Sequence, residues 1–207
     1  MAQQVFPTKS NLMATKRSLA LAEQGYHLMD RKRNILVREM MQLIDRAAGI
    51  QDRISAAYAE AYDALQKANI MLGSVGEYAG GVPVEYGLRL STRSVMGVEL
   101  PTLRLNTTSP MGLYYDLEST NGTLDVAYLK FNEVKTLTVE LAEVETSVIR
   151  LAEAIQKTQK RANALGNVQI PQMQKTIKSI DEVLSERERE EFSRLKVIKA
   201  QKEKEEA

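Results

Sequence analysis

Apolar residues recur every seventh position along the first third of the chain. One series starts at Leu12 and a second starts at Thr15. The two series contain Leu12, Leu19, Tyr26, Arg33, Met40, Ala47, Ile54, Ala61, Ala68, Thr15, Ala22, Met29, Leu36, Leu43, Ile50, Ala57, Ala64 and Met71, and only Thr15 and Arg33 are not apolar. An apolar spacing of about 3.5 residues, sustained over this length, is typical of a coiled-coil helix. The pattern predicts one long helix that begins after Pro7 and ends near residues 73–76.

A second apolar series runs through the last third of the chain. It contains Val134, Leu137, Leu141, Val144, Val148, Leu151, Ile155, Thr158, Ala162 and Leu165, and it resumes at Ile170, Met173, Ile177, Ile180 and Leu184. The step from Leu165 to Ile170 is one residue too long to keep the helical phase. Such an insertion unwinds a coiled coil locally or is absorbed as a π-bulge.

Gly166 and Pro171 lie beside this phase change, although helix interiors usually exclude both residue types. A proline removes a backbone donor and clashes with the carbonyl four residues before it. A bulge that already loosens that carbonyl accommodates the proline, so we expect a kinked but continuous helix. The alternative is two separate helices joined near residue 167.

The middle of the chain has a different character. Residues 75–124 carry glycines and prolines typical of turns, and the segments 84–92 and 98–105 have a strand-like pattern. A turn at Met96-Gly97 would join them into a short β-hairpin, or the region forms a small irregular cap. The expected divisions are an N-terminal coiled-coil helix (1–74), the cap (75–124) and a C-terminal coiled-coil helix (125–207).

Neither long helix is stable alone in water, and the connector suits a hairpin of helices. The predicted fold is therefore dominated by α-helix: a long antiparallel two-helix coiled coil with a small β-hairpin or irregular cap. Placing Met71 opposite residues near 129 sets Arg33 opposite residues near 167, and Lys9 near the acidic run that begins at Asp181. The alanine-rich end of the first helix either packs tightly against its partner or forms a shelf for a small protein.

Composition and charge exclude several functions. The net charge of +1 and the short basic group 31–33 give no reason to expect nucleic acid. Cysteine is absent, so thiolate metal sites and disulfides are excluded, and the single histidine, His27, cannot form a metal cluster. Acidic residues alternate with basic ones, as on a solvated helix face. We therefore expect no catalytic residue, no cofactor and no metal, and no segment that inserts into a membrane.

Three stretches resemble one known family. Residues 7–40 (PTKSNLMATKRSLALAEQGYHLMDRKRNILVREM) are similar to the opening of the D subunit of V-type and A-type rotary ATPases. RANALGNVQIPQMQKTI and SEREREEFSRLKVIK resemble that family's C-terminal helix, and SVMGVELP resembles its central hairpin. These stretches follow the family's order over almost the whole chain, whereas residues 102–125 match only loosely.

The resemblance implies a function that the helices alone do not name. The D subunit is the central rotor shaft of these ATPases and is not itself an enzyme. It stands inside a hexamer of catalytic A and nucleotide-binding B subunits, binds the F subunit of the rotor, and couples through an adaptor subunit to the membrane rotor that moves protons or sodium ions. The resemblance implies a cytoplasmic protein, peripheral to the membrane. By analogy we expect Arg189, Arg194, Lys196 and Lys199 to meet the catalytic ring, and Met96, Gly97 and Val98 to lie in the region that faces partners.

A non-rotary coiled-coil scaffold or tether would explain the heptads equally well. It would not explain the phase change, the glycine and proline beside it, or the ordered family stretches. An enzyme is the third class, and the absence of a recognisable catalytic motif argues against it.

Overall fold

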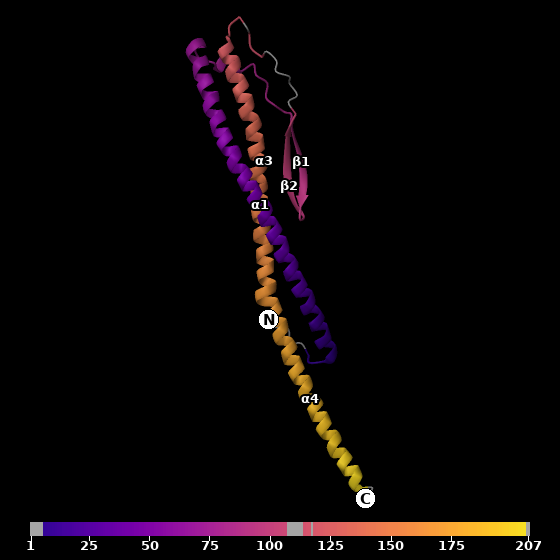
Figure 1. Cartoon of the computed structure of the whole chain (residues 1–207). Coiled ribbons are helices and arrows are strands. Elements are labelled where there is room, and N and C mark those ends of the chain that lie inside the picture. The colour runs from indigo at the N-terminus through magenta and orange to yellow at the C-terminus, as the bar shows by residue number, and fades with distance from the viewer. Residues whose placement is uncertain (1–5, 107–113, 117, 206–207) are drawn as a thin grey trace. The chain divides into compact units, whose positions relative to one another are not determined.

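The computed structural model describes residues 6–106, 114–116 and 118–205. In chain order the elements are α1 (Lys9–Leu72), α2 (Gly76–Ala79), β1 (Leu88–Val95), β2 (Val98–Leu105), α3 (Gly122–Ala164), the π-helical turn η1 (Leu165–Gln169) and α4 (Ile170–Glu205) (Figure 1). A helical chain with one antiparallel hairpin between its long helices confirms the predicted fold class. The short helix α2 was not predicted.

The chain forms two compact units. One contains Asn34–Gln156, and the other contains Met1–Arg33 together with Lys157–Ala207. The division expected from the sequence, into 1–74, 75–124 and 125–207, follows chemical character along the chain rather than contacts. It stays a prediction about segments.

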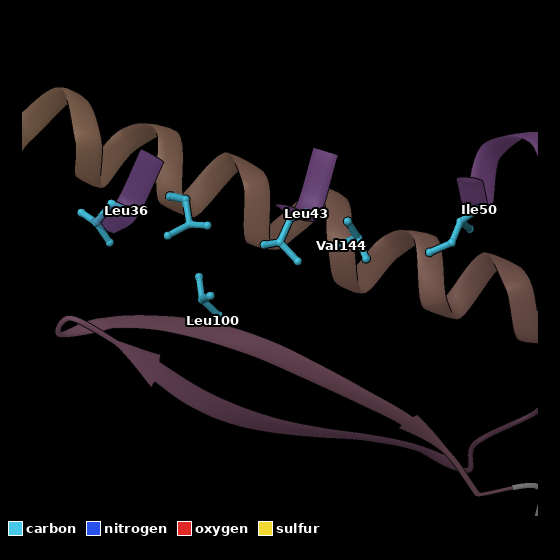
Figure 2. Packing of buried hydrophobic residues seen from close by; sticks show 6 residues of the cluster. Leu36, Leu43, Ile50, Leu100 and Val144 are labelled. Atoms are coloured by element: carbon cyan, nitrogen blue, oxygen red, sulfur yellow. The ribbon is translucent and has the colours of Figure 1, made fainter. Parts of the chain in front are cut away.

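The core of the first unit, Asn34–Gln156, lies where α1 packs antiparallel against α3. Figure 2 shows Leu36, Leu43 and Ile50 from α1 beside Val144 from α3 and Leu100 from β2. Farther along the pair, Ala57 and Ala61 pack against Val134 and Leu137, and Ala68 packs against Leu124. Ala64, on the same face of α1, is also buried. The alanines thus support close helix packing, and the shelf is not needed to explain them. Of the eighteen seam positions predicted in α1, Met71 alone is exposed (68%).

In the second unit, α1 as far as Arg33 faces the end of α3, the turn η1 and α4. The helix continues without a gap from α3 through η1 into α4, and the five residues Leu165–Gln169 form the π-turn. Both the continuous helix and the bulge at the phase change are therefore confirmed. A bend of the helix axis at this point stays a prediction.

The predicted register between the helices was wrong by about two helical turns. Arg33 donates from Nη1 to Oε1 of Gln159 at 2.9 Å, so it lies well before residue 167. The residue opposite the π-turn is Tyr26, whose ring lies against Gly166. A heptad seam fits its partner equally well after a slide of one heptad, so the seam alone did not fix the register. Lys9 does lie near the acidic run, 3.9 Å from Glu188.

Local chemistry explains where the elements end. Gly73, at φ +82°, closes α1, and its N–H donates to the carbonyl of Asn69. Asn121 precedes α3, and its side-chain oxygen accepts from the backbone N–H of Thr123. Met96 (φ 50°) and Gly97 (φ 76°) form the two-residue turn that joins β1 to β2, which confirms the predicted hairpin turn.

Candidate docking surfaces

The last part of α4 carries apolar side chains that nothing in the described chain covers. Lys9, the first residue of α1, reaches Glu188, and every described side chain of α4 from Ser185 onward is exposed. Phe192 (70% exposed), Leu195 (64%) and Ile198 (51%) follow at three-residue steps and form one stripe. We call these three residues the α4 stripe. Exposed apolar side chains that lie together on one helix face make this stripe a candidate docking surface.

The four basic residues expected at the catalytic ring all border this stripe. Arg189 precedes Phe192 by three residues, Lys196 follows Phe192 by four, Arg194 precedes Ile198 by four, and Lys199 follows Leu195 by four. Residues three or four apart are neighbours on a helix surface, so each basic group lies about one turn from an apolar one. The long side chains of arginine and lysine can cover apolar surface while their charged ends meet acidic groups.

The π-turn places a glycine where no larger residue fits without movement. A Cβ atom on Gly166 would lie 2.9 Å from Cε2 of Tyr26. Ile170 donates its backbone N–H to the carbonyl of Leu165, which is the wide hydrogen bond of the π-turn. Pro171 follows directly, as the second residue of α4. The sequence signal for this arrangement was the extra residue in the apolar series.

The hairpin packs against the helix pair through β2 and through the end of β1 nearest the turn. The register of its two strands runs from the pair Val95↔Val98 beside the turn to the pair Leu88↔Leu105 at the open end. Leu100 is fully buried among the helices, and Val98 packs against the same cluster, so Val98 supports the hairpin from inside. Met96 remains 43% exposed at the turn. Of the three residues expected in the region that faces partners, Met96 is exposed at the turn, and Val98 is partly buried against the core cluster.

The polar contacts of the hairpin come from both helices. Glu143 on α3 accepts from the backbone N–H of Leu103 at 2.6 Å, and Arg150 donates to the carbonyl of Glu99 at 3.0 Å. Arg93 on β1 forms an ion pair of 2.7 Å with Glu39 on α1. The sequence did not predict these contacts, because a single polar pair between residues far apart in the chain leaves no periodic pattern.

At the cap end of Asn34–Gln156, aromatic residues surround an apolar cavity of about 280 Å³. It is lined by Leu65, Val75, Tyr78, Val82, Tyr115, Leu124, Ala127, Tyr128 and Phe131. The hydroxyl of Tyr115 donates to Asp125 at 2.5 Å. Burial of the phenol, followed by the hydrogen bond to the Asp125 carboxylate and its charge, raises the pKa of Tyr115 to about 12.

The described residues contain no group of three or more His, Cys, Asp or Glu side chains that could hold a metal ion. None of the helices in this part of the chain combines the length and apolar content needed to cross a bilayer.

Comparison with known proteins gives one family over nearly the whole chain. The family model for the ATP synthase D subunit matches residues 11–200. The chain is 46% identical over 200 residues to the D subunit of the V-type ATP synthase of Thermotoga neapolitana, covering 94% of this chain and 97% of the relative. It is 39% identical to the D subunit of the A-type ATP synthase of Pyrococcus abyssi (94% and 92% covered) and 36% identical to that of Methanosphaera stadtmanae (93% and 92%).

Proposed function

Because the chain belongs to the family of the ATP synthase D subunit, we propose that it is the central rotor shaft of a V/A-type rotary ATPase. In this role it has no catalytic site of its own. It transmits rotation between ATP hydrolysis or synthesis in the hexamer of A and B subunits and the transport of protons or sodium ions in the membrane sector. It would lie on the cytoplasmic side, peripheral to the membrane.

The observation that carries this proposal is the pairing of two long helices with different exposed faces. A shaft must resist twisting, and an antiparallel pair with a closely packed seam supplies stiffness. It must also be asymmetric, because it has to bias three similar catalytic sites differently at each angle. Such bias is a coupling free energy, set by contacts that differ from one subunit to the next.

Each exposed surface can be assigned to one of the partners expected of such a shaft. The α4 stripe and its basic neighbours would contact the ring of A and B subunits. The hairpin would face the F subunit of the rotor, and the cap end, with its aromatic residues, would face the adaptor to the membrane rotor. Aromatic side chains around a pocket favour such docking because they bury large areas at low entropic cost.

The π-turn would be the most compliant point of the shaft. A π-turn followed by proline weakens the backbone hydrogen bonding there. Arg33 contacts Gln159, and Tyr26 lies opposite the π-turn, so the compliant point rests on η1 alone. Pro171→Ala should raise the torsional stiffness measured in single-molecule rotation, and unchanged stiffness and coupling would remove this hypothesis.

One experiment separates the rotor from the rival scaffold. The complex is reassembled with the full chain or with a chain truncated after Leu184, and ATP hydrolysis and ion transport are measured together. A rotor without the end of α4 should lose the coupling between ATP hydrolysis and ion transport, because the ring no longer contacts a surface that changes with the angle of the shaft. A scaffold or tether would leave the ratio of transported ions to hydrolysed ATP unchanged, and that result would contradict the proposal.

A further inference from the structure

The two edges of the hairpin differ in how their backbone groups are satisfied. In an antiparallel pair, successive residues of a strand point their backbone N–H and C=O groups alternately toward the partner strand and away from it. The two-residue turn and the hydrogen bond from the N–H of Asn106 to the carbonyl of Gly87 show which residues point inward. Odd-numbered residues of β1 therefore pair with β2. The even-numbered residues Leu88, Leu90, Thr92 and Ser94 direct their backbone N–H and C=O groups outward.

The outer edge of β2 is closed by the molecule itself. Leu103 donates to Glu143, and the carbonyl of Glu99 accepts from Arg150. Between them, Pro101 has no N–H to leave unpaired. On this edge the N–H of Leu103 and the carbonyl of Glu99 are thus bonded to α3, and Pro101 offers no N–H to an incoming strand.

The outer edge of β1 has no such closure. Along β1 all residues but Val95 are exposed, and no described residue hydrogen-bonds to the outward groups of Leu88, Leu90, Thr92 or Ser94. Figure 1 shows β2 between β1 and α3, so the edge of β1 points away from the helices. An eight-residue strand with an open edge is a template for one more strand.

Side chains beside this edge indicate what would bind. Arg89 pairs directly with Arg104 across the ladder, and neither arginine has an ion-pair partner among the described residues. Like charges in this position repel, so an acidic side chain in the next strand would relieve them. On the opposite face, Leu88 and Leu90 are exposed by 50% and 66%.

From this asymmetry we propose that β1 accepts an extended strand from another subunit of the complex, which makes the hairpin a three-stranded sheet. The incoming strand places an acidic residue beside Arg89 and apolar residues beside Leu88 and Leu90. Antiparallel pairing of β1 with β1 of a second copy, centred on Ser91, would set Arg89 opposite Arg93 of the copy, so that register is disfavoured. The inference rests on the proposed membership of a multi-subunit ATPase and adds how one subunit attaches.

Amide hydrogen exchange of the isolated chain and of the assembled complex tests the proposal at single-residue resolution. In the isolated chain the odd-numbered amides of β1 should be protected and the even-numbered ones open. On assembly, hydrogen exchange at the amides of the outward, even-numbered residues should slow by about tenfold or more.

If the chain assembles but these amides exchange as they do in isolation, the inference is wrong while the rotor proposal stands. If no nucleotide-hydrolysing complex assembles, the rotor proposal itself fails. Protection that depends on the concentration of the isolated chain would show self-pairing and would also overturn the inference.

A matched pair of variants checks that backbone pairing is the cause. Thr92→Pro removes one outward N–H, opposite a position where the hairpin already holds Pro101, whereas Thr92→Ala keeps the N–H. The proline variant should reduce retention of the complex on the immobilised chain about tenfold, and the alanine variant should retain it. Equal retention by both variants would contradict strand addition. The exchange measurement on the unmodified chain still decides the question should Thr92→Pro disturb the hairpin.

Discussion

At the π-turn, Gly166 leaves room for the ring of Tyr26. Replacing a helical glycine by alanine normally stabilises a protein by about 0.5–1 kcal/mol. Gly49→Ala, with no atom near the added Cβ, should show this gain. Gly166→Ala should instead be less stable than Gly49→Ala by about 1 kcal/mol, since the methyl group overlaps the Tyr26 ring. Chemical denaturation of both variants measures the difference. If Tyr26→Leu does not recover the loss in the Gly166→Ala background, the ring contact is not its cause.

Tyr115 makes a prediction about pH. Its pKa is raised to about 12 when folded, above the ordinary value of 10, so the folded state holds the phenol proton more tightly than the unfolded chain. This contribution to stability is complete below about pH 10 and is lost as the pH rises toward 12. Absorbance titration should show one tyrosine that ionises late. Tyr115→Phe should remove that step, and Asp125→Asn should lower its pKa only partly, because burial, the largest single cause, remains. A late step that persists in Tyr115→Phe would contradict the assignment.

At the scale of elements, the apolar pattern predicted the helices themselves better than the pairing between them. The seven-residue series identified both long helices and nearly all their buried positions, and the five-residue step identified η1. The register failed because successive heptads are interchangeable, whereas Arg33–Gln159 and Tyr26–Gly166 are single contacts without a pattern. The closed edge of β2 was missed for the same reason, since Glu143 and Arg150 look like ordinary surface charges on α3.

The corrected register can be tested with introduced thiols, because the chain has no cysteine of its own. Arg33→Cys combined with Gln159→Cys should crosslink efficiently with a short bifunctional reagent. Arg33→Cys combined with Asn167→Cys should crosslink poorly, because the two turns between residues 159 and 167 add roughly 12 Å along the helix. Gel mobility of the two double variants gives the comparison. Preferential crosslinking of the second pair would restore the register predicted from the heptads.

For the whole molecule, stability and function should separate in the α4 stripe. Phe192, Leu195 and Ile198 are exposed on a helix that meets no other described element there, so replacing all three with serine should leave thermal unfolding of the isolated chain almost unchanged. In the assembled complex the same change removes apolar surface worth about 1.5–3 kcal/mol for each side chain that the ring buries. ATP hydrolysis should then lose its coupling to ion transport.

Val197 offers the control for this prediction. It is 58% exposed in the same segment but faces away from the stripe, so Val197→Ser should retain coupling. Equal loss in both variants would mean that the segment acts through its helicity rather than through one face. If the triple variant still couples ATP hydrolysis to ion transport fully, coupling does not depend on contacts between the ring and the α4 stripe. The pair therefore distinguishes a shaft that presents a particular face at each angle from a helix that only fills the centre of the ring, and only the first can bias three catalytic sites in turn.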